Sequence, residues 1–351
     1  MNSMKLIFRL AYEEEKDSWD RVVQRSDAGT WLHLWEIEEV LAEHLDCEIV
    51  RFCCEQDGDL VSVLPMFLVD GDRIGNSRRL FLWYHGRPVL FLRLMIRSMI
   101  KGHLPCAIST PLSGYGGPVS VSSSGVDPNA MTGLIQYCSR FLSKMVRSIQ
   151  ITMSPIGHDA ATYDALVRNG YELTCEDDFL VNLRPPLREI EKRFNKDCRI
   201  AVRQGLRRGA EIVKARSTAD LETCWQMSSL RFEEQGKRAT IPLALYLKLH
   251  EVLSRRGYVR AYLARFGGVP IGGMSCVVFP KWRAIYWVSG FDHKYRRLRP
   301  QNLLLYHAIC DLKDEGAESF ELGRATTAGL KKWKSDWGSE VLRVHHFERV
   351  M

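Results

Sequence analysis

Two consecutive prolines near the middle of the chain, Pro185 and Pro186, constrain its fold more than any other local feature. Proline fixes φ and lacks an amide hydrogen, so neither a helix nor the interior of a sheet continues through such a pair. The chain has 351 residues, whereas a typical domain holds roughly 100–200. We therefore predict two domains, residues 1–184 and residues 185–351.

Strand and helix patterns alternate on both sides of the prolines, which predicts an α/β (α+β) fold with a mixed sheet in each half. In the first half the predicted elements are a strand at 5–11, a helix at 31–45, a hairpin of strands at 48–54 and 60–69, a helix at 128–145, a strand at 148–153 and a helix at 159–169. In the second half they are helices at 196–208, 219–234 and 242–254, strands at 259–265, 271–279 and 284–289, a helix at 300–315, a strand at 319–322, a short helix at 328–333 and a strand at 341–347.

The composition excludes several classes of protein. The apolar share of 46% and the charged share of 26% are those of a folded globular chain. The ten cysteines lack the spacing of a zinc site, so we expect buried thiols, no metal and a cytoplasmic location. The most apolar stretch, residues 80–100, contains charged residues, glycine and proline, which argues against a membrane span.

Basic residues recur at helical spacing within the predicted helix at 196–208. Arg199, Arg203 and Arg207 lie four residues apart and share one helix face with Lys196. The net charge of +7 and the preference of arginine for phosphate favour an anion site over a plain solvated face. A weaker stripe in the apolar stretch fits either a membrane surface or, preferably, a core helix with one wet face. Its members are Arg93, Arg97 and Lys101.

A second basic segment joins the predicted strand at 284–289 to the helix that begins at Pro300. Arg296, Arg297 and Arg299 precede a helix N-terminus, where the helix dipole attracts anions. The segment is therefore either an anion site or a charged surface loop. Asp292 is a candidate general base, although capping of this turn is the more common role for such a residue.

The segment from Gly323 to Gly338 combines a strand end, a glycine corner and a short helix. Trp333 and Trp337 share one helix face and should pack into the domain, which leaves Lys334 as a surface lysine. On these residues the sequence resembles the FemAB family of transferases, within the wider GNAT acyltransferase fold. The matching pairs are Gly323-Arg324, Trp333-Lys334 and Trp337-Gly338, supported by Tyr115 to Pro118, by the basic helix, by Gly267 to Gly273 and by Tyr295 to Leu304.

The resemblance implies two tandem GNAT-like acyltransferase domains with substrates in a groove between and across them. It implies transfer of an acyl or aminoacyl group to an amine of a cell-wall precursor or, in relatives, of an exopolysaccharide. It places Lys334 and Trp333 at the reaction centre, with Arg324 beside them, and assigns Tyr115, Arg199 and Arg203 to the phosphates of the precursor. The residues of our own anion-site hypotheses, Arg207 and Arg297, join this set of substrate-binding candidates.

The acyl donor and the activity itself stay open. The turn at 297–302 has no glycine, which argues against the usual backbone cradle for CoA and favours aminoacyl-tRNA over acyl-CoA. The helical arm of some tRNA-dependent members is absent, which removes one indication of tRNA. We expect no tightly bound cofactor, a lipid-linked or UDP-linked precursor, at most peripheral membrane contact and no DNA. The alternatives are a silent protein that binds a phosphorylated glycan or nucleic acid, and an acyl-CoA N-acyltransferase of polysaccharide synthesis.

Overall fold

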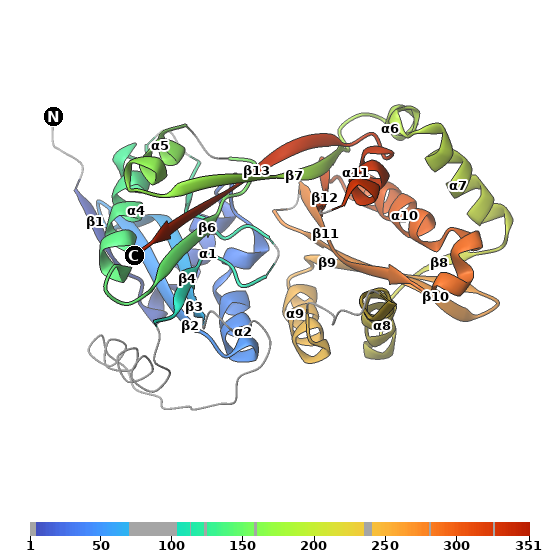
Figure 1. Ribbon diagram of the computed structural model, residues 1–351, viewed down its shortest axis with the longest axis horizontal. Helices are drawn as coiled ribbons and strands as arrows, with labels where there is room; N and C mark the ends of the chain where they lie inside the picture. The colour runs from blue at the N-terminus through green and yellow to red at the C-terminus, as the bar shows by residue number, and fades with distance from the viewer. Residues whose placement is uncertain are drawn as a thin grey trace. The chain divides into compact units, whose positions relative to one another are not determined.

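The computed structural model divides the chain into two compact units, unit 1 (Met1–Glu176 and Arg343–Met351) and unit 2 (Asp177–Leu342). It describes residues 5–69, 104–112, 114–122, 125–157, 160–234, 241–280, 282–325 and 327–351. Each unit contains a mixed sheet with helices against it, which confirms the predicted fold class (Figure 1). The predicted border at residue 184 follows strand β7 (Glu172–Asn182), whereas the division falls within this strand, and the domain limits stay a prediction.

Unit 1 is built on a sheet in which the paired strands of the described residues are antiparallel except for β4 and β6, which are parallel. The strand order is β1 (Leu6–Leu10), β2 (Glu48–Gln56), β3 (Asp59–Val69), β4 (Cys106–Ile108), β6 (Ser148–Thr152) and β13 (Glu340–Val350), with β5 (Val119–Ser120) also paired to β3. The turn between β2 and β3 is the predicted Asp-Gly turn, in which Asp57 and Gly58 have φ of 51° and 100°.

The helices of unit 1 cover both faces of this sheet. Among the described residues they are α1 (Lys16–Gln24), α2 (Trp35–Leu45), α4 (Asn129–Leu142) and α5 (Ala160–Arg168), with short 3-10 turns η1 (Glu13–Glu15) and η2 (Trp31–His33). One core lies where α4 and α5 pack on the sheet, around Phe52, Leu134 and Ile149. The segment 31–45, predicted as one helix, starts as η2 and continues as α2. The sequence patterns missed α1, whose few apolar residues Trp19, Val22 and Val23 are all buried.

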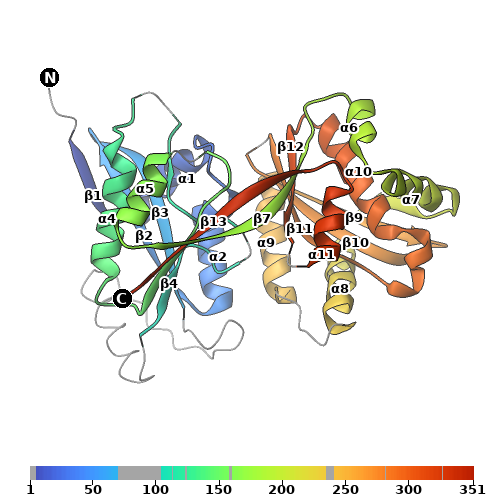
Figure 2. The same cartoon turned by 45° about the horizontal axis from the view of Figure 1, so that its top comes forward.

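Unit 2 repeats this construction. Its strand order is β7, β12 (Ser319–Arg324), β11 (Arg283–Phe291), β10 (Val269–Val278), β9 (Val259–Phe266) and β8 (Glu211–Lys214). Helices α8 (Thr218–Glu234) and α9 (Leu243–Arg255) lie on one face (Figures 1 and 2). The other face carries α6 (Leu187–Arg193), α7 (Lys196–Arg207), α10 (Pro300–Asp314) and α11 (Ala328–Ser335).

The core of unit 2 lies between its sheet and α10, which contributes Leu303, Leu304 and Ile309. The helices predicted at 196–208, 219–234, 242–254, 300–315 and 328–333 are confirmed as α7 to α11. Pro185 and Pro186 precede α6, so the prolines start a helix that the sequence patterns missed. The exposed strand β8 was also missed, because four residues offer too short a pattern. The predicted stripe of Arg93, Arg97 and Lys101 lies outside the described residues.

Candidate active site of the second unit

Strands β11 and β12 run parallel but pair at only three positions. Arg283, Ala284 and Ile285 of β11 face Ser319, Phe320 and Glu321 of β12, and no further pair forms between them in the described residues. Within this paired stretch, the guanidinium Nε of Arg283 donates to the carboxylate of Glu321, and both side chains are fully buried. The strands therefore start together at a buried ion pair, after which β11 continues without β12 beside it.

A β-bulge lies in β11 just beyond the paired stretch. Ser275 of β10 faces Val288 of β11, whereas the next residue of β10, Cys276, faces Tyr286, so Trp287 is the extra residue. A bulge interrupts the regular ladder and bends the strand, and bulges often lie beside active sites. Strand β11 therefore presents irregular backbone where β12 no longer accompanies it.

One polar network holds the bulge from the side of α9. The hydroxyl of Ser275 lies 2.6 Å from Tyr246 Oη and 3.1 Å from His250 Nε2. The His250 ring stacks on the Trp287 ring at a centroid distance of 5.6 Å. Burial lowers the pKa of His250 to about 4, so this imidazole is neutral near pH 7. The three buried side chains thus fix the bulged residue without adding a charge.

A second network holds β11 from the side of α10. The Gln301 amide Nε2 donates to Tyr286 Oη at 2.8 Å and to Ser289 Oγ at 2.9 Å. Gln301 lies in the first turn of α10, so the start of this helix is joined directly to β11. Neither network was predicted, because their members are separated along the sequence and no local motif marks them.

Lys334 belongs to α11, and its side chain packs against the end of β12. It is buried, with 4% of its surface exposed. Its Nζ donates to the carbonyl oxygens of Gly323 at 2.6 Å and of Arg324 at 2.7 Å. The prediction of a surface lysine is therefore wrong. Helical spacing correctly turned Trp333 and Trp337 inward, but the end of β12 covers the neighbouring position as well. Lys334 and Arg324, both predicted site residues, lie side by side.

The charge of Lys334 is weakened by its surroundings. Burial lowers its pKa to about 8, the carboxylate of Asp178 opposes this shift, and the guanidinium of Arg324 adds to it. Asp178 is buried in β7, directly opposite Arg324 in the β7–β12 register. The sequence patterns missed Asp178, because only the pairing of two distant strands brings it here. A lysine with a pKa near neutrality is typical of functional sites.

The basic turn before α10 adopts the short 3-10 helix η3 (His293–Leu298). The Asp292 carboxylate accepts the backbone N–H of Lys294 at 2.9 Å, so Asp292 caps this turn. Arg299 has a φ of 57°, the left-handed conformation that favours glycine, and Pro300 follows as the first residue of α10. The turn thus adopts, at Arg299, a backbone conformation that usually requires glycine. Pro300 has no backbone N–H, so the start of α10 offers one donor fewer to an anion.

Helix α7 joins the two groups of predicted residues. Near its start, the backbone N–H of Asn195 donates to the Asp336 carbonyl at 2.7 Å, next to α11. Near its end, the guanidinium of Arg208 donates to the Arg297 carbonyl in η3. Arg203 and Arg207 are exposed and Arg199 is half-buried. The structure therefore connects the α7 arginines with Arg297 at one end and with the Lys334 helix at the other.

The remaining predicted residues have plain structural surroundings. The half-buried Trp333 ring lies 6.2 Å from the ring of Trp337, which itself packs edge-on against Phe194 at 5.1 Å. Tyr115 is buried in unit 1, where its carbonyl oxygen accepts a hydrogen bond from Thr30 Oγ1 at 3.0 Å. Trp333 thus packs as its helical spacing predicts.

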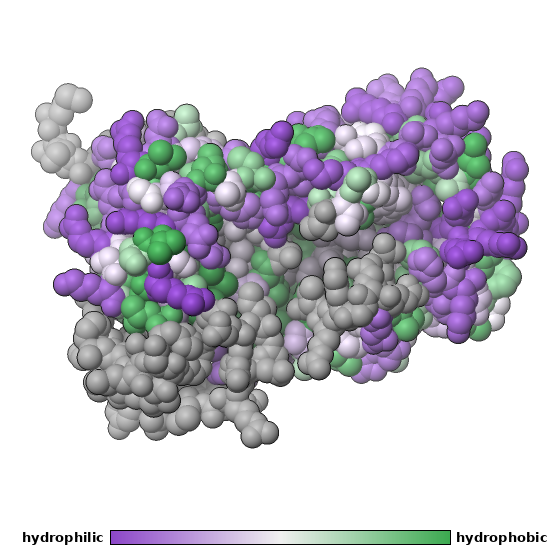
Figure 3. All heavy atoms as spheres, viewed as in Figure 1, coloured by the Kyte–Doolittle hydropathy of each residue, from purple (hydrophilic) through white to green (hydrophobic). Residues whose placement is uncertain are grey.

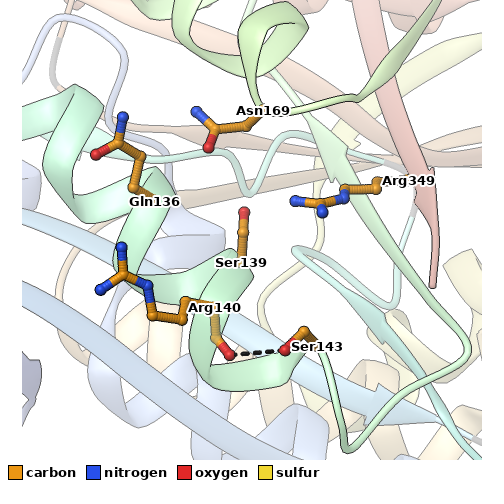
Figure 4. A pocket seen from close by; sticks show the side chains of 6 residues that line it. All are labelled: Gln136, Ser139, Arg140, Ser143, Asn169 and Arg349. Carbon is orange, nitrogen blue, oxygen red and sulfur yellow. Dashed lines mark hydrogen bonds between the residues drawn. The ribbon is translucent and has the colours of Figure 1, made fainter.

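Unit 1 also contains a polar cavity of about 460 Å³ (Figure 4). It is lined by Gln136, Ser139, Arg140, Ser143, Asn169 and Arg349. None of the predicted site residues lines this cavity. In the part of the chain that the structure describes, no group of His, Cys, Asp or Glu has the arrangement of a metal site. No helix within the same described ranges is long and apolar enough to cross a membrane.

Comparison with known proteins agrees with this architecture. Residues 192–335 match the family model of the acetyltransferase (GNAT) domain. No protein of curated function matches the sequence. The crystal structure of FemX superposes with a TM-score of 0.69 at 12% identity, over 99% of this chain and 98% of that chain.

Two further solved structures are similar over nearly the whole chain. The C-terminal domain of a putative lysylphosphatidylglycerol synthetase from Agrobacterium fabrum has a TM-score of 0.56 at 14% identity, over 95% of this chain and 91% of that chain. A tandem GNAT protein from the clavulanic acid biosynthesis pathway has a TM-score of 0.54 at 11% identity, over 99% and 98%. At these identities the likeness is one of fold, and it confirms the predicted tandem GNAT-like architecture.

Proposed function

We propose that this chain is a FemAB-like acyltransferase of the GNAT superfamily, because residues 192–335 match the family model of the acetyltransferase (GNAT) domain and its fold is similar to that of FemX. It moves an acyl or aminoacyl group from an activated ester or thioester to an amine of a cell-wall or surface-polysaccharide precursor. The observation that carries the proposal is Lys334, a buried lysine held at the end of β12 beside Arg324 with its pKa lowered to about 8.

The proposed reaction begins when the acceptor amine, as the free base, attacks the acyl carbonyl carbon. The carbon–nitrogen bond forms, the carbonyl oxygen gains negative charge, and the bond to the leaving oxygen or sulfur then breaks. Backbone N–H groups of β11 around the bulge at Trp287 are proposed to polarise the carbonyl. The amine loses a proton and the leaving group gains one, so the overall transfer is neutral.

Lys334 is proposed to stabilise the developing oxyanion or the leaving atom. Its ammonium form has three N–H donors, of which two are engaged by the Gly323 and Arg324 carbonyls. The third is available to a reacting oxygen, and burial strengthens its effect because the local dielectric is low. Arg324 supports the same charge, and Trp333 contributes to the wall of the site. Asp292 remains a weaker candidate for the base, since its carboxylate already caps η3.

The acyl donor is proposed to be aminoacyl-tRNA or acyl-CoA. A GNAT domain generally uses acyl-CoA as its donor, and the left-handed conformation of Arg299 forms a tight turn before α10 that could lie against the pyrophosphate of CoA. Pro300, however, leaves fewer N–H groups at the helix end for a pyrophosphate, which favours the alternative donor. Arg297, Arg199, Arg203 and Arg207 are proposed to bind phosphates of the substrates. Tyr115 of unit 1 is proposed to contact the precursor.

Thermal stability measured against three ligands in parallel distinguishes the donors and tests the proposal. The ligands are an acyl-CoA, an aminoacyl-tRNA and a UDP-linked muropeptide. A ligand at 100 times its Kd adds about 2.7 kcal/mol to the free energy of unfolding, which raises Tm by several degrees. We expect one donor and the muropeptide to raise Tm, and that donor to support transfer of a labelled acyl group. No shift and no transfer with any of the three would contradict the proposal.

The pKa of Lys334 predicts the pH dependence of both activity and stability. If its ammonium form assists transfer, kcat falls as pH rises through about 8. The folded-state pKa lies below the ordinary value of 10.5, so the unfolded chain binds more protons between pH 8 and pH 10.5. Stability should therefore rise with pH across this window. Urea unfolding at several pH values should show this slope in the wild type and a smaller one in Lys334→Met, and equal slopes would contradict it.

A further inference from the structure

The outward face of α7 combines cations with apolar side chains. At 100° per residue, the buried positions Cys198, Ala201, Val202 and Gly205 mark the inner face of the helix. The side of the helix away from them defines the α7 face, which consists of Lys196, Arg199, Ile200, Arg203 and Arg207, with Leu206 on one flank and Gln204 and the exposed Asp197 on the other. Leu206 is 56% exposed and Ile200 is 37% exposed. The helix therefore presents four cations interleaved with two aliphatic side chains.

The cations of the α7 face are not neutralised by the protein. Among the described residues, none of the four forms an ion pair with a carboxylate. Other cations of unit 2 do have acidic partners, in the pairs Lys214–Asp311, Arg260–Glu315, Arg265–Asp220 and Lys331–Asp177. Like charges four residues apart on a helix repel one another. This face is therefore suited to a partner that brings several negative charges.

Exposed apolar residues continue next to the end of α7. Phe266 is 40% exposed and Val269 is 50% exposed, at the turn between β9 and β10. The Phe266 ring lies close to Gly209, two residues after the end of α7, since a Cβ on Gly209 would be 3.9 Å from its Cε2. Figure 3 shows hydrophilic and hydrophobic surface side by side in this part of unit 2. Four apolar side chains thus accompany the four cations.

The face is rigidly mounted. The Asn195 side chain accepts the N–H of Asp197 at 3.0 Å and caps the start of α7. At the other end, a Cβ on Gly205 would lie 2.8 Å from the Leu298 carbonyl, which shows how closely the helix packs on η3. The helix is therefore already folded before a partner binds, so binding loses no free energy to ordering its backbone.

We propose that the α7 face and the β9–β10 turn form a docking surface for an anionic lipid bilayer. Arginines spaced along one helix face contact lipid phosphates, while Leu206, Phe266 and Val269 enter the boundary between headgroups and acyl chains. A nucleic acid would satisfy the charges equally well, but it would leave the aliphatic side chains of Leu206 and Val269 in water. Recognition of single-stranded nucleic acid relies instead on a series of exposed aromatic rings, whereas the described residues of this surface include one such ring, Phe266. The proposal extends the phosphate-binding role of the α7 arginines from substrate phosphates to lipid phosphates, and vesicle binding is measured independently of the transfer reaction.

Co-sedimentation with vesicles tests the proposal on the full chain. The probes are vesicles of phosphatidylglycerol with phosphatidylcholine, vesicles of phosphatidylcholine alone, and tRNA in a separate binding assay. We expect the protein to bind the anionic vesicles, and this binding to weaken as the salt concentration rises. In the Arg203→Glu, Arg207→Glu variant the affinity should fall at least ten-fold, since each cation near an anionic surface contributes roughly five-fold. Leu206→Ser with Phe266→Ser should also weaken it, with less dependence on salt.

The matched control changes the net charge by the same amount elsewhere. Arg21→Glu with Lys144→Glu alters two exposed cations of unit 1 and should leave vesicle binding unchanged. All variants replace exposed side chains, and unchanged Tm values would verify that they fold. The proposal is overturned if the protein does not bind anionic vesicles, or if the α7 variant and the control bind them equally. Binding of tRNA through the α7 arginines without binding of vesicles would overturn it as well.

Discussion

Lys334→Ala is expected to lower kcat for acyl transfer by ten-fold or more while KM changes little. A preorganised donor that meets a developing oxyanion contributes roughly 10²–10³ in kcat. The Nζ of Lys334 is held by the Gly323 and Arg324 carbonyls at 2.6 and 2.7 Å, so its position is fixed before substrate arrives. The measurement is steady-state transfer of a labelled acyl group with the donor identified by thermal stabilisation.

Two comparison variants separate chemistry from folding. Lys332→Ala removes an exposed lysine of the same helix, which pairs with Asp336, and should leave kcat unchanged. Lys334→Met keeps most of the buried side-chain volume without the charge, so it should fold with a Tm close to the wild type and still lose activity. Full activity in Lys334→Met would exclude this lysine from the proposed mechanism. Its role would then be structural, through its hydrogen bonds to the end of β12.

Arg283→Met is expected to destabilise the protein by about 3–5 kcal/mol, because it leaves a buried carboxylate without its cation. Arg283 and Glu321 are both fully buried where β11 and β12 begin their short parallel pairing. The pair therefore supports the point at which the two strands separate. Chemical denaturation followed by tryptophan fluorescence measures the change in the free energy of unfolding, provided that unit 2 unfolds in one transition.

The double variant Arg283→Met, Glu321→Leu tests whether the loss arises from an uncompensated charge. Replacing both partners by apolar residues should recover most of the stability, since an intact buried ion pair adds little beyond such a replacement. As a control, Arg184→Ala breaks the exposed pair with Glu318 and should cost less than about 1 kcal/mol. A small effect of Arg283→Met alone would contradict the prediction.

Features that depend on near neighbours along the chain were predictable from sequence. The stripe of α7 cations and the inward Trp333 and Trp337 follow from helical spacing, and the turn at Asp57-Gly58 follows from its two residues. The same local patterns gave the alternation of strands and helices in both units. The family resemblance, carried by a few glycine, arginine, aromatic and lysine positions, supplied the tandem acyltransferase fold that the comparisons confirm.

The surroundings of the candidate site were decided only by the tertiary structure. Asp178 meets Arg324 through the register of β7 and β12, and His250 meets Ser275 because α9 packs on β10. Lys334 becomes buried because the end of β12 covers it, although its own helix pattern placed it at the surface. Local periodicity indicates which side of a helix or strand is apolar. Which other helix or strand packs against that side depends on the strand order and register of the sheet. The sequence alone therefore determined most of the elements, the basic helix face and the resemblance to acyltransferases, whereas the fold determined which distant side chains surround the candidate site.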